Sequence, residues 1–172
     1  MAAHLSLVGQ LSRAPALYSC SMKTIQTLAE LASYVGQEVA ISPWIEITQD
    51  KVNQFAQATG DHQWIHVDVE RAKAGPFGGP IAHGFLTLSL LPLFFESTIT
   101  VTESAMGVNY GLNKVRFMAP VPVGSRLRAR MKMLQCDAID NQGVQMIWEV
   151  AVQREGSDKP VCVAESIVRR YP

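Results

Sequence analysis

The sequence predicts a single α+β domain in which an antiparallel sheet packs around one apolar helix. The chain has 172 residues, a length typical of one domain with a substantial core. Residues 81–95 are apolar almost throughout, which is typical of a helix surrounded by protein. Residues 125–133 and 144–152 instead alternate apolar and polar side chains, as strands with one buried face do. Asn141 to Gly143 can form the tight turn that joins these two strands.

The composition excludes several classes of protein. Hydrophobic residues make up 48% of the chain and charged residues 17%, which excludes a disordered chain. Lys and Arg together number 15, as do Asp and Glu, so nothing favours nucleic acid or a membrane surface as a partner. The apolar run at 81–95 is shorter than the roughly 20 residues that a membrane span needs. The three cysteines, Cys20, Cys136 and Cys162, form no Cys-x-x-Cys pair and suit reduced thiols in a cytoplasmic protein.

The first 22 residues differ from the rest of the chain. They contain one arginine and no acidic residue, and they match neither a transit peptide nor a secretory signal well. We expect a disordered N-terminal extension over 1–22, with Met22 as an alternative start, followed by one folded domain over 23–172.

Apolar periodicity and capping residues predict the elements of the first half of this domain. Thr24 can cap an amphipathic stripe that Gly36 ends, and Thr48 can cap another. In chain order we expect a helix over 24–35, a strand over 38–47 interrupted near Pro43, a helix from Thr48 to Gly60, a loop over 61–66 and a short capped helix over 68–74.

The second half predicts the central helix and most of the sheet. Residues 75–80 read GPFGGP, which cannot be regular structure. Pro92 should kink the helix predicted over 81–95 or end its regular part. The predicted sheet consists of a strand pair near 106–110 and 114–118, followed by strands at 125–133, 144–152 and 161–169.

Side chains suited to chemistry gather just before the central helix. Asp61 and His66 stand five positions apart in the predicted loop. A carboxylate and an imidazole, whose ordinary pKa is about 6.5, are the usual pair for activating water near neutral pH. His83 and Gly84 stand where the apolar helix begins, and the first N–H groups of a helix have no partner within it. We therefore expect the Gly84 amide to be available to a developing oxyanion.

Each of these residues also has a purely structural interpretation. Asp61 follows Gly60 and serves equally well as a turn or cap residue, and spacing alone does not prove that Asp61 and His66 meet. Taken singly, His66 and His83 are more often structural histidines, and their shared neighbourhood is what favours function. His62 and His66 have the spacing of metal ligands on a helix, but the segment is predicted as a loop without a nearby cysteine, so we expect no metal.

Three runs of the sequence resemble a known family. Residues 55–68 read FAQATGDHQWIHVD and residues 77–89 read FGGPIAHGFLTLS. Together they resemble the MaoC-like dehydratase family, whose best-known members are (R)-specific enoyl-CoA hydratases. Residues 109–124, NYGLNKVRFMAPVPVG, are similar to the same family and especially to its branch around the nodulation protein NodN. The likeness extends over residues 41–169.

The resemblance implies a fold and an activity. The fold would be a hot-dog fold, in which an antiparallel sheet wraps a central helix, and two copies would form a homodimer sheet edge to sheet edge. Asp61 and His66 would form a catalytic dyad, and the Gly84 amide would hold the thioester oxygen. The reaction would be reversible syn addition of water to a trans-2-enoyl-CoA, giving an (R)-3-hydroxyacyl-CoA in fatty acid metabolism. It would need no metal and no redox cofactor.

The sequence departs from the family pattern between the two dyad residues. The family motif is Asp-x-Asn-Pro-x-His, whereas Gln63 and Trp64 stand here in place of Asn-Pro. We therefore expect differences in how water is positioned and in the preferred acyl chain. Cations should line the route of the CoA phosphates, although the cationic face of residues 126–132 is more simply the solvated side of a strand. The residues expected to bind substrate are Gln63, His83, Asn109, Asn113, Lys114 and Arg116.

Two other functions fit a domain of this kind. An acyl-CoA thioesterase on the same fold typically relies on a carboxylate early in the central helix, and residues 81–91 contain none. A non-catalytic acyl-CoA-binding subunit would be permitted by the Gln63-Trp64 change. It would bind acyl-CoA without turnover and be insensitive to Asp61→Asn.

Overall fold

The computed structural model describes residues 22–172, so the extension predicted for 1–22 lies outside the described residues except for Met22. The elements in chain order are β1 (Lys23–Ile25), the 3-10 helix η1 (Ala29–Tyr34), β2 (Glu38–Ile41), β3 (Ile45–Glu46), α1 (Gln49–Thr59), α2 (Trp64–Val67), α3 (Val69–Lys73), α4 (Gly84–Ser89), α5 (Leu91–Glu96), β4 (Ile99–Val101), β5 (Met106–Phe117), β6 (Arg126–Ala138), β7 (Val144–Arg154) and β8 (Pro160–Tyr171).

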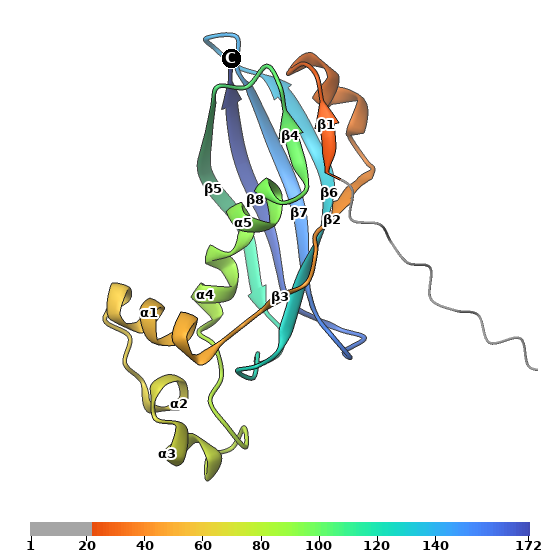
Figure 1. The fold of residues 1–172 in the computed structure, drawn as a ribbon. Coiled ribbons are helices and arrows are strands. Elements are labelled where there is room, and N and C mark those ends of the chain that lie inside the picture. Colours follow the sequence, from red (N-terminus) through yellow and green to blue (C-terminus); the bar gives the residue numbers. More distant parts are fainter. Residues whose placement is uncertain (1–21) are drawn as a thin grey trace, which may run out of the picture.

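The long strands form an antiparallel sheet that curls around the helical segment α4–α5 (Figure 1). Within residues 22–172 the strand order is β2–β6–β7–β8–β5, and β3 also pairs with β6. The two-residue alternation places one set of side chains on the concave face, where they pack against the helices. The alternation predicted for 125–133 is confirmed, because its apolar members are all fully buried: Leu127, Ala129, Met131 and Met133.

The hairpin between β6 and β7 turns where the sequence predicts. Asn141 and Gln142 adopt positive φ values of 60° and 55°. The N–H of Gly143 donates to the carbonyl oxygen of Asp140 at 3.3 Å and closes the turn. Two consecutive positive φ values match the right-handed twist of the flanking strands, so the turn also fixes the strand register.

The central helix is split in two, as the position of Pro92 predicts. A break at Leu90 separates α4 from α5, and Pro92, which has no N–H, lies in the first turn of α5. Phe94 is fully buried against the sheet. The expectation that this helix is buried all round is wrong, because Phe85 is 67% exposed and Leu93 is 44% exposed. One face of the helix is therefore open in the single chain.

Helix α1 begins and ends at the predicted residues. The hydroxyl oxygen of Thr48 accepts a hydrogen bond from the N–H of Lys51 at 3.3 Å and caps the first turn. Gly60 ends the helix in the left-handed conformation, with φ of 77°. The strand predicted over 38–47 is likewise confirmed as β2 and β3, separated around Pro43.

Two predicted elements at the edges of the fold are wrong. Thr24 does not cap a helix: it lies in β1, which pairs in parallel with β4, and only Ala29–Tyr34 are helical. Ile25 is fully buried in this pairing, so tertiary contact outweighs the local helical pattern. Residues 106–110 and 114–118 do not pair with each other, because both belong to the single strand β5, which pairs with β8.

The loop predicted over 61–66 is partly wrong as well. Residues 64–67 form one helical turn, α2, in which the N–H of His66 donates to the carbonyl oxygen of Gln63 at 3.0 Å. This turn directs the His66 ring toward the interior, where its side chain is buried. Asp68 then caps α3 as predicted, and residues 75–80 form no helix or strand.

Helices long and apolar enough to span a membrane are absent from the part of the chain that the structure describes.

Replacing Phe94 with alanine should remove the largest fully buried side chain of the core. We expect the free energy of unfolding to fall by about 3–5 kcal/mol, because the cavity cannot close fully. Glu96→Ala, at an exposed polar position of the same helix, is the control and should cost less than about 1 kcal/mol. Urea denaturation followed by circular dichroism measures both. Equal losses would show that α5 does not pack into the sheet as described.

Candidate active site

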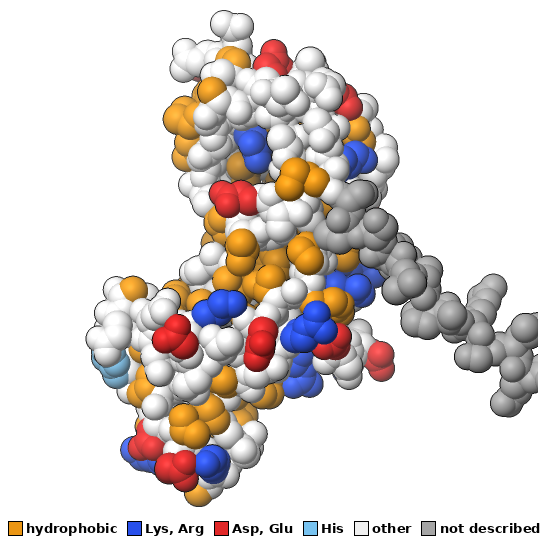
Figure 2. All heavy atoms as spheres, viewed as in Figure 1, with side chains coloured by type: hydrophobic (Ala, Val, Ile, Leu, Met, Phe, Trp, Pro, Cys, Tyr) orange, Lys and Arg blue, Asp and Glu red, His pale blue; other side chains and the backbone are white. Residues whose placement is uncertain are grey.

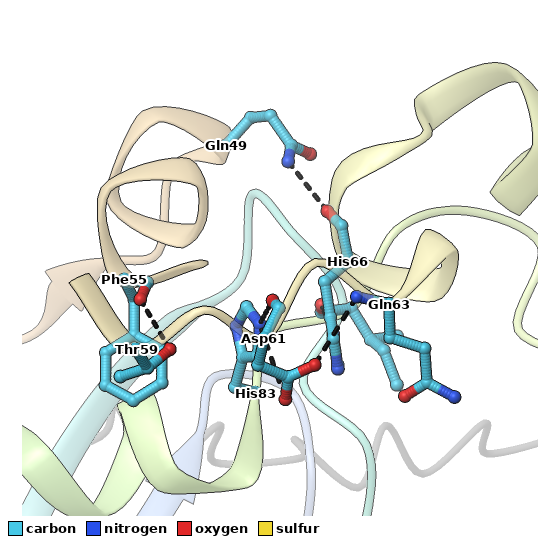
Figure 3. A network of polar contacts seen from close by, with 8 residues as sticks. Gln49, Phe55, Thr59, Asp61, Gln63, His66 and His83 are labelled. Atoms are coloured by element: carbon cyan, nitrogen blue, oxygen red, sulfur yellow. Dashed lines mark hydrogen bonds and ion pairs between the residues drawn. The ribbon is translucent and has the colours of Figure 1, made fainter. Parts of the chain in front are cut away.

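Three segments meet beside the first turn of α4: the residues after α1, the turn α2 and the residues that precede α4 (Figure 3). They bring together Asp61, His66 and His83. A carboxylate oxygen of Asp61 and one nitrogen of each imidazole lie within 4.8 Å of one another. Spacing in the sequence left this meeting open, and the structure establishes it.

His66 is buried and held in one orientation. Its side chain belongs to a residue that is 6% exposed, and its Nδ1 lies 2.7 Å from the carbonyl oxygen of Ile81. A carbonyl oxygen only accepts hydrogen bonds, so Nδ1 carries the proton and Nε2 carries the free lone pair. Gln49 also holds the main chain at this point, because its side-chain amide donates to the His66 carbonyl oxygen at 2.8 Å. The ring is therefore set up to accept a proton at Nε2.

The surroundings of His66 lower its pKa below the ordinary value of 6.5. Burial is the main cause, since it disfavours the charged imidazolium. The bond to the Ile81 carbonyl acts in the opposite direction, His83 lowers the pKa further, and the Asp61 carboxylate raises it. The net direction keeps His66 neutral, and thus able to act as a base, at neutral pH.

His83 lies immediately behind this pair. It is 2% exposed, and its ring stacks on that of His66 with centroids 3.8 Å apart and an interplanar angle of 28°. Its Nε2 lies 2.9 Å from the main-chain oxygen of Asp61. On its other side the ring of Phe55 packs at 5.0 Å. His83 thus contacts both members of the predicted dyad.

The Asp61 carboxylate lies at the solvent boundary of the cluster. Its side chain is 53% exposed, and Oδ2 is 3.9 Å from Nε2 of His83. The main-chain N–H of Gln63 reaches Oδ1 at 3.4 Å, which is a long hydrogen bond. The carboxylate therefore keeps most of its capacity to accept hydrogen bonds from a bound molecule.

A cleft of about 370 Å³ opens beside His66 and Gly84. Its walls are mainly apolar, with Phe117, Met118 and Val161 opposite the helix. Gly84 packs closely against the ring of Phe117, since a Cβ at this position would lie 3.0 Å from it. A side chain here would press on that ring, whereas glycine presents main chain to the cleft.

The other predicted substrate-binding residues lie elsewhere in the single chain. Lys114 pairs with Glu165 at 3.0 Å, and the Asn113 amide lies 3.5 Å from the same carboxylate. Arg116 donates to the carbonyl oxygen of Val115, its neighbour in the chain, at 2.8 Å. Asn109 lines a different cavity, between α5 and β5. The amide of Gln63 points away from the Asp61 carboxylate (Figure 3). Their roles stay predictions.

Several residues of the site escaped sequence reasoning. Phe117 and Met118 were part of a run that resembles the family, but no periodicity assigned them to the cleft. Gln49 lies in the first turn of α1, 17 positions from the residue whose carbonyl it holds. Such contacts depend on how α1, α2 and the end of β5 come together, and local sequence carries no signal for that.

One carboxylate and two imidazoles are also a possible ligand set for a metal ion. A metal must lie near the plane of each ring, about 2.1 Å from the nitrogen. The rings of His66 and His83 are stacked and nearly parallel, so their in-plane lone pairs run side by side and do not converge. This geometry suits proton transfer better than metal binding.

A curled antiparallel sheet around a central helix defines a hot-dog-fold protein. Residues 30–155 match the family model for the MaoC like domain. The chain therefore belongs to the MaoC-like dehydratase family.

Relatives within this family cover most of the chain. It is 56% identical over 148 residues to the 3-hydroxyacyl-thioester dehydratase Z of Mycobacterium tuberculosis, covering 86% of this chain and 98% of that protein. It is 46% identical over 143 residues to nodulation protein N of Rhizobium leguminosarum bv. viciae, covering 82% and 89%. Among solved structures, unliganded R-hydratase PhaJ1 from Pseudomonas aeruginosa superposes with a TM-score of 0.64 at 25% identity, covering 84% and 85%.

The lowered pKa of His66 should make stability depend on pH. As pH falls below about 6.5, the unfolded chain binds a proton at this residue that the folded chain still excludes, so the free energy of unfolding should decrease. His66→Gln removes this titration and should flatten the decrease between pH 8 and pH 5, as measured by urea denaturation. The exposed neighbour His62, changed to Gln, should leave the wild-type slope intact. Identical slopes for wild type and His66→Gln would count against a buried neutral imidazole.

Proposed function

We propose that this protein catalyses the reversible, (R)-specific hydration of trans-2-enoyl-CoA thioesters to (R)-3-hydroxyacyl-CoA. One observation carries the proposal: a carboxylate oxygen of Asp61 and a nitrogen of His66 lie within 4.8 Å, close enough to share one water molecule, and His66 lines the same cleft as Gly84. The 56% identity to a protein named 3-hydroxyacyl-thioester dehydratase supports a thioester substrate.

The two acceptors account for both hydrogens of the reacting water. One O–H would point to Nε2 of His66 and the other to the Asp61 carboxylate, which leaves a lone pair of the water oxygen facing the substrate. His66 takes the first proton as the oxygen bonds to the β-carbon, and the electron pair of the double bond moves toward the thioester oxygen. The imidazolium then returns the proton to the α-carbon on the same face. The sum is syn addition of one water molecule.

The negative charge that develops on the thioester oxygen needs a hydrogen-bond donor. Gly84 is the first residue of α4, so its N–H has no acceptor within the helix. Residue 84 carries no side chain, and the ring of Phe117 lies against this position. Losing one such donor typically costs about 2.7–4 kcal/mol of transition-state stabilisation. The apolar wall of Phe117, Met118 and Val161 would exclude bulk water from the same space.

The thioesterase alternative has less support. The first turn of α4 holds no acidic residue, so the carboxylate that such an enzyme uses early in the central helix is missing from this position. A non-catalytic binding subunit is the outcome that the kinetic test below distinguishes.

Asp61→Asn and His66→Gln should each lower kcat by about 10²–10⁴-fold, since a neutral amide can accept a hydrogen bond from the water but cannot take up its proton or supply a negative charge. The assay follows loss of the conjugated thioester absorbance of crotonyl-CoA and longer trans-2-enoyl-CoAs. His62→Gln is the control, because His62 is exposed and should retain wild-type turnover. Acyl-CoA binding by folded wild-type protein without hydration at any chain length would instead identify a binding subunit.

We also propose that two copies pair through β5 into a homodimer. β5 is an edge of the sheet, so one side of its main chain has no partner strand among residues 22–172. Large apolar side chains on this strand and on the nearby open face of α4–α5 are exposed, and apolar surface is visible over the same elements (Figure 2). On this strand they are Met106, Val108, Tyr110, Leu112 and Phe117.

The free thiols Cys136 and Cys162 support a cytoplasmic location for the protein.

Leu112→Arg should break this association, because it places a charge in the centre of the apolar edge. Sedimentation velocity should give about twice the chain mass of 18.9 kDa for wild type and the single mass for the variant. Val35→Arg, at an equally exposed apolar residue beyond η1, is the control and should leave the mass doubled. A monomeric wild-type protein would rule out pairing through β5.

A further inference from the structure

His83 makes two contacts that no other described residue makes. Its Nε2 lies 2.9 Å from the main-chain oxygen of Asp61, and its ring covers one face of His66 at 3.8 Å. Because the Asp61 main-chain oxygen only accepts, the nitrogen that faces it, Nε2 of His83, must carry a proton. His83 is 2% exposed, so it lies behind the reacting groups and away from solvent.

The bond to Asp61 leaves the other nitrogen of His83 without a partner. Nδ1 is buried and finds no hydrogen bond among the described residues. A buried polar atom in this condition costs stability, and an apolar ring of similar shape would avoid that cost. Packing alone therefore does not account for a histidine at this position. The proton on Nε2 accounts for the histidine, because it forms the hydrogen bond to the main-chain oxygen of Asp61.

Asp61 has few other constraints. Its side chain is 53% exposed, and within residues 22–172 it receives the long hydrogen bond from the Gln63 N–H and lies 3.9 Å from Nε2 of His83. Its main chain follows Gly60, where α1 has ended. His83 is the N-cap residue of α4, and its Nε2 bonds to the main-chain oxygen of Asp61. Within the described chain this is the one short hydrogen bond between residue 61 and the start of α4.

We propose that His83 is a positioning residue that holds the Asp61 main chain through Nε2–H and shields His66 with its ring, without touching substrate. This assignment rests on the proposed function, since it concerns how the Asp–His pair is aligned on one water molecule. It differs from the sequence-based expectation, in which His83 bound the substrate.

The two contacts can be separated by two substitutions. His83→Gln keeps an N–H donor at nearly the position of Nε2 but loses the ring. His83→Phe keeps a ring over His66 but loses the donor. Since Phe also removes the unpartnered Nδ1, it should fold with a Tm no lower than that of wild type.

The kinetic test compares kcat and the pH profile of kcat/KM. His83→Phe should lower kcat at its plateau by about tenfold, because the carboxylate is no longer held. His83→Gln should keep kcat within about threefold of wild type. In His83→Gln the acidic limb of the kcat/KM pH profile should move to higher pH. The reason is that the pKa of His66 rises when the His83 ring no longer covers it. The titratable groups that act on His66 in the described structure are His83 and Asp61. His62→Gln and His62→Phe are the matched controls and should change neither quantity.

A second measurement does not depend on turnover. Long-range ¹H–¹⁵N correlation spectra of the wild-type protein report which nitrogen of each histidine carries the proton. We expect Nε2–H at His83 and Nδ1–H at His66. The opposite tautomer at His83 would overturn the proposal even in a protein that hydrates nothing.

The outcomes separate the two proposals. Hydration by wild type with unchanged kcat in His83→Phe would reject the role of His83 and leave the proposed function standing. Equal losses of kcat in the Phe and Gln variants would also reject it, because a donor placed near the position of Nε2 would then not preserve turnover. Failure of wild type to hydrate any enoyl-CoA would reject the proposed function, and the tautomers would still decide whether His83 holds Asp61. If His83→Phe does not fold, two measurements still decide whether His83 is a positioning residue. They are the shift of the acidic limb in the kcat/KM pH profile of His83→Gln and the tautomers of His83 and His66 in the wild-type protein.

Discussion

The site depends on a short extended segment, residues 80–82, that is fixed from two sides. On one side Ile81 donates its N–H to the carbonyl oxygen of Ile65 and accepts the Nδ1 proton of His66. On the other side the N–H of Ala82 donates to the carbonyl oxygen of Val121 at 2.8 Å. The chain then enters α4 at Gly84, two residues after these bonds. The constraint therefore sets, at once, where the helix starts, which way the His66 ring faces and how close His83 stands to Asp61.

This arrangement places polar chemistry inside an apolar frame. His66 and His83 are buried among the helices while Asp61 remains at the surface, so the cluster has one dry side and one side open to solvent. Burial keeps His66 neutral, and the main-chain bonds choose its tautomer. The same burial leaves Nδ1 of His83 unpartnered, which is a cost in stability. Sites that hold reacting groups in fixed geometry often carry such a cost.

Much of the fold follows from local patterns. The alternation along β6 and β7, the turn at Asn141 and Gln142, the Thr48 cap and the Gly60 stop are all visible in the sequence and all present in the structure. The errors lie where tertiary contacts outweigh local preference. Ile25 belongs to a helical stripe by spacing but is drawn into β1 by pairing with β4. The exposed face of α4–α5 was predicted to be buried, because a sequence that is apolar on all sides of a helix does not indicate which side packs against protein.

By itself the sequence determined the α+β class, most element boundaries and the two short runs that carry Asp61, His66, His83 and Gly84, because periodicity, caps and motifs are local properties. Only the tertiary structure decided that the three polar side chains meet, that His83 stacks on His66, and that Phe117 and Met118 form the opposite wall. His83 lies 17 residues from His66 and 22 from Asp61 in the sequence, and the residues of the opposite wall lie further away still. Their geometry depends on how the sheet curls around the split helix, which no local pattern encodes.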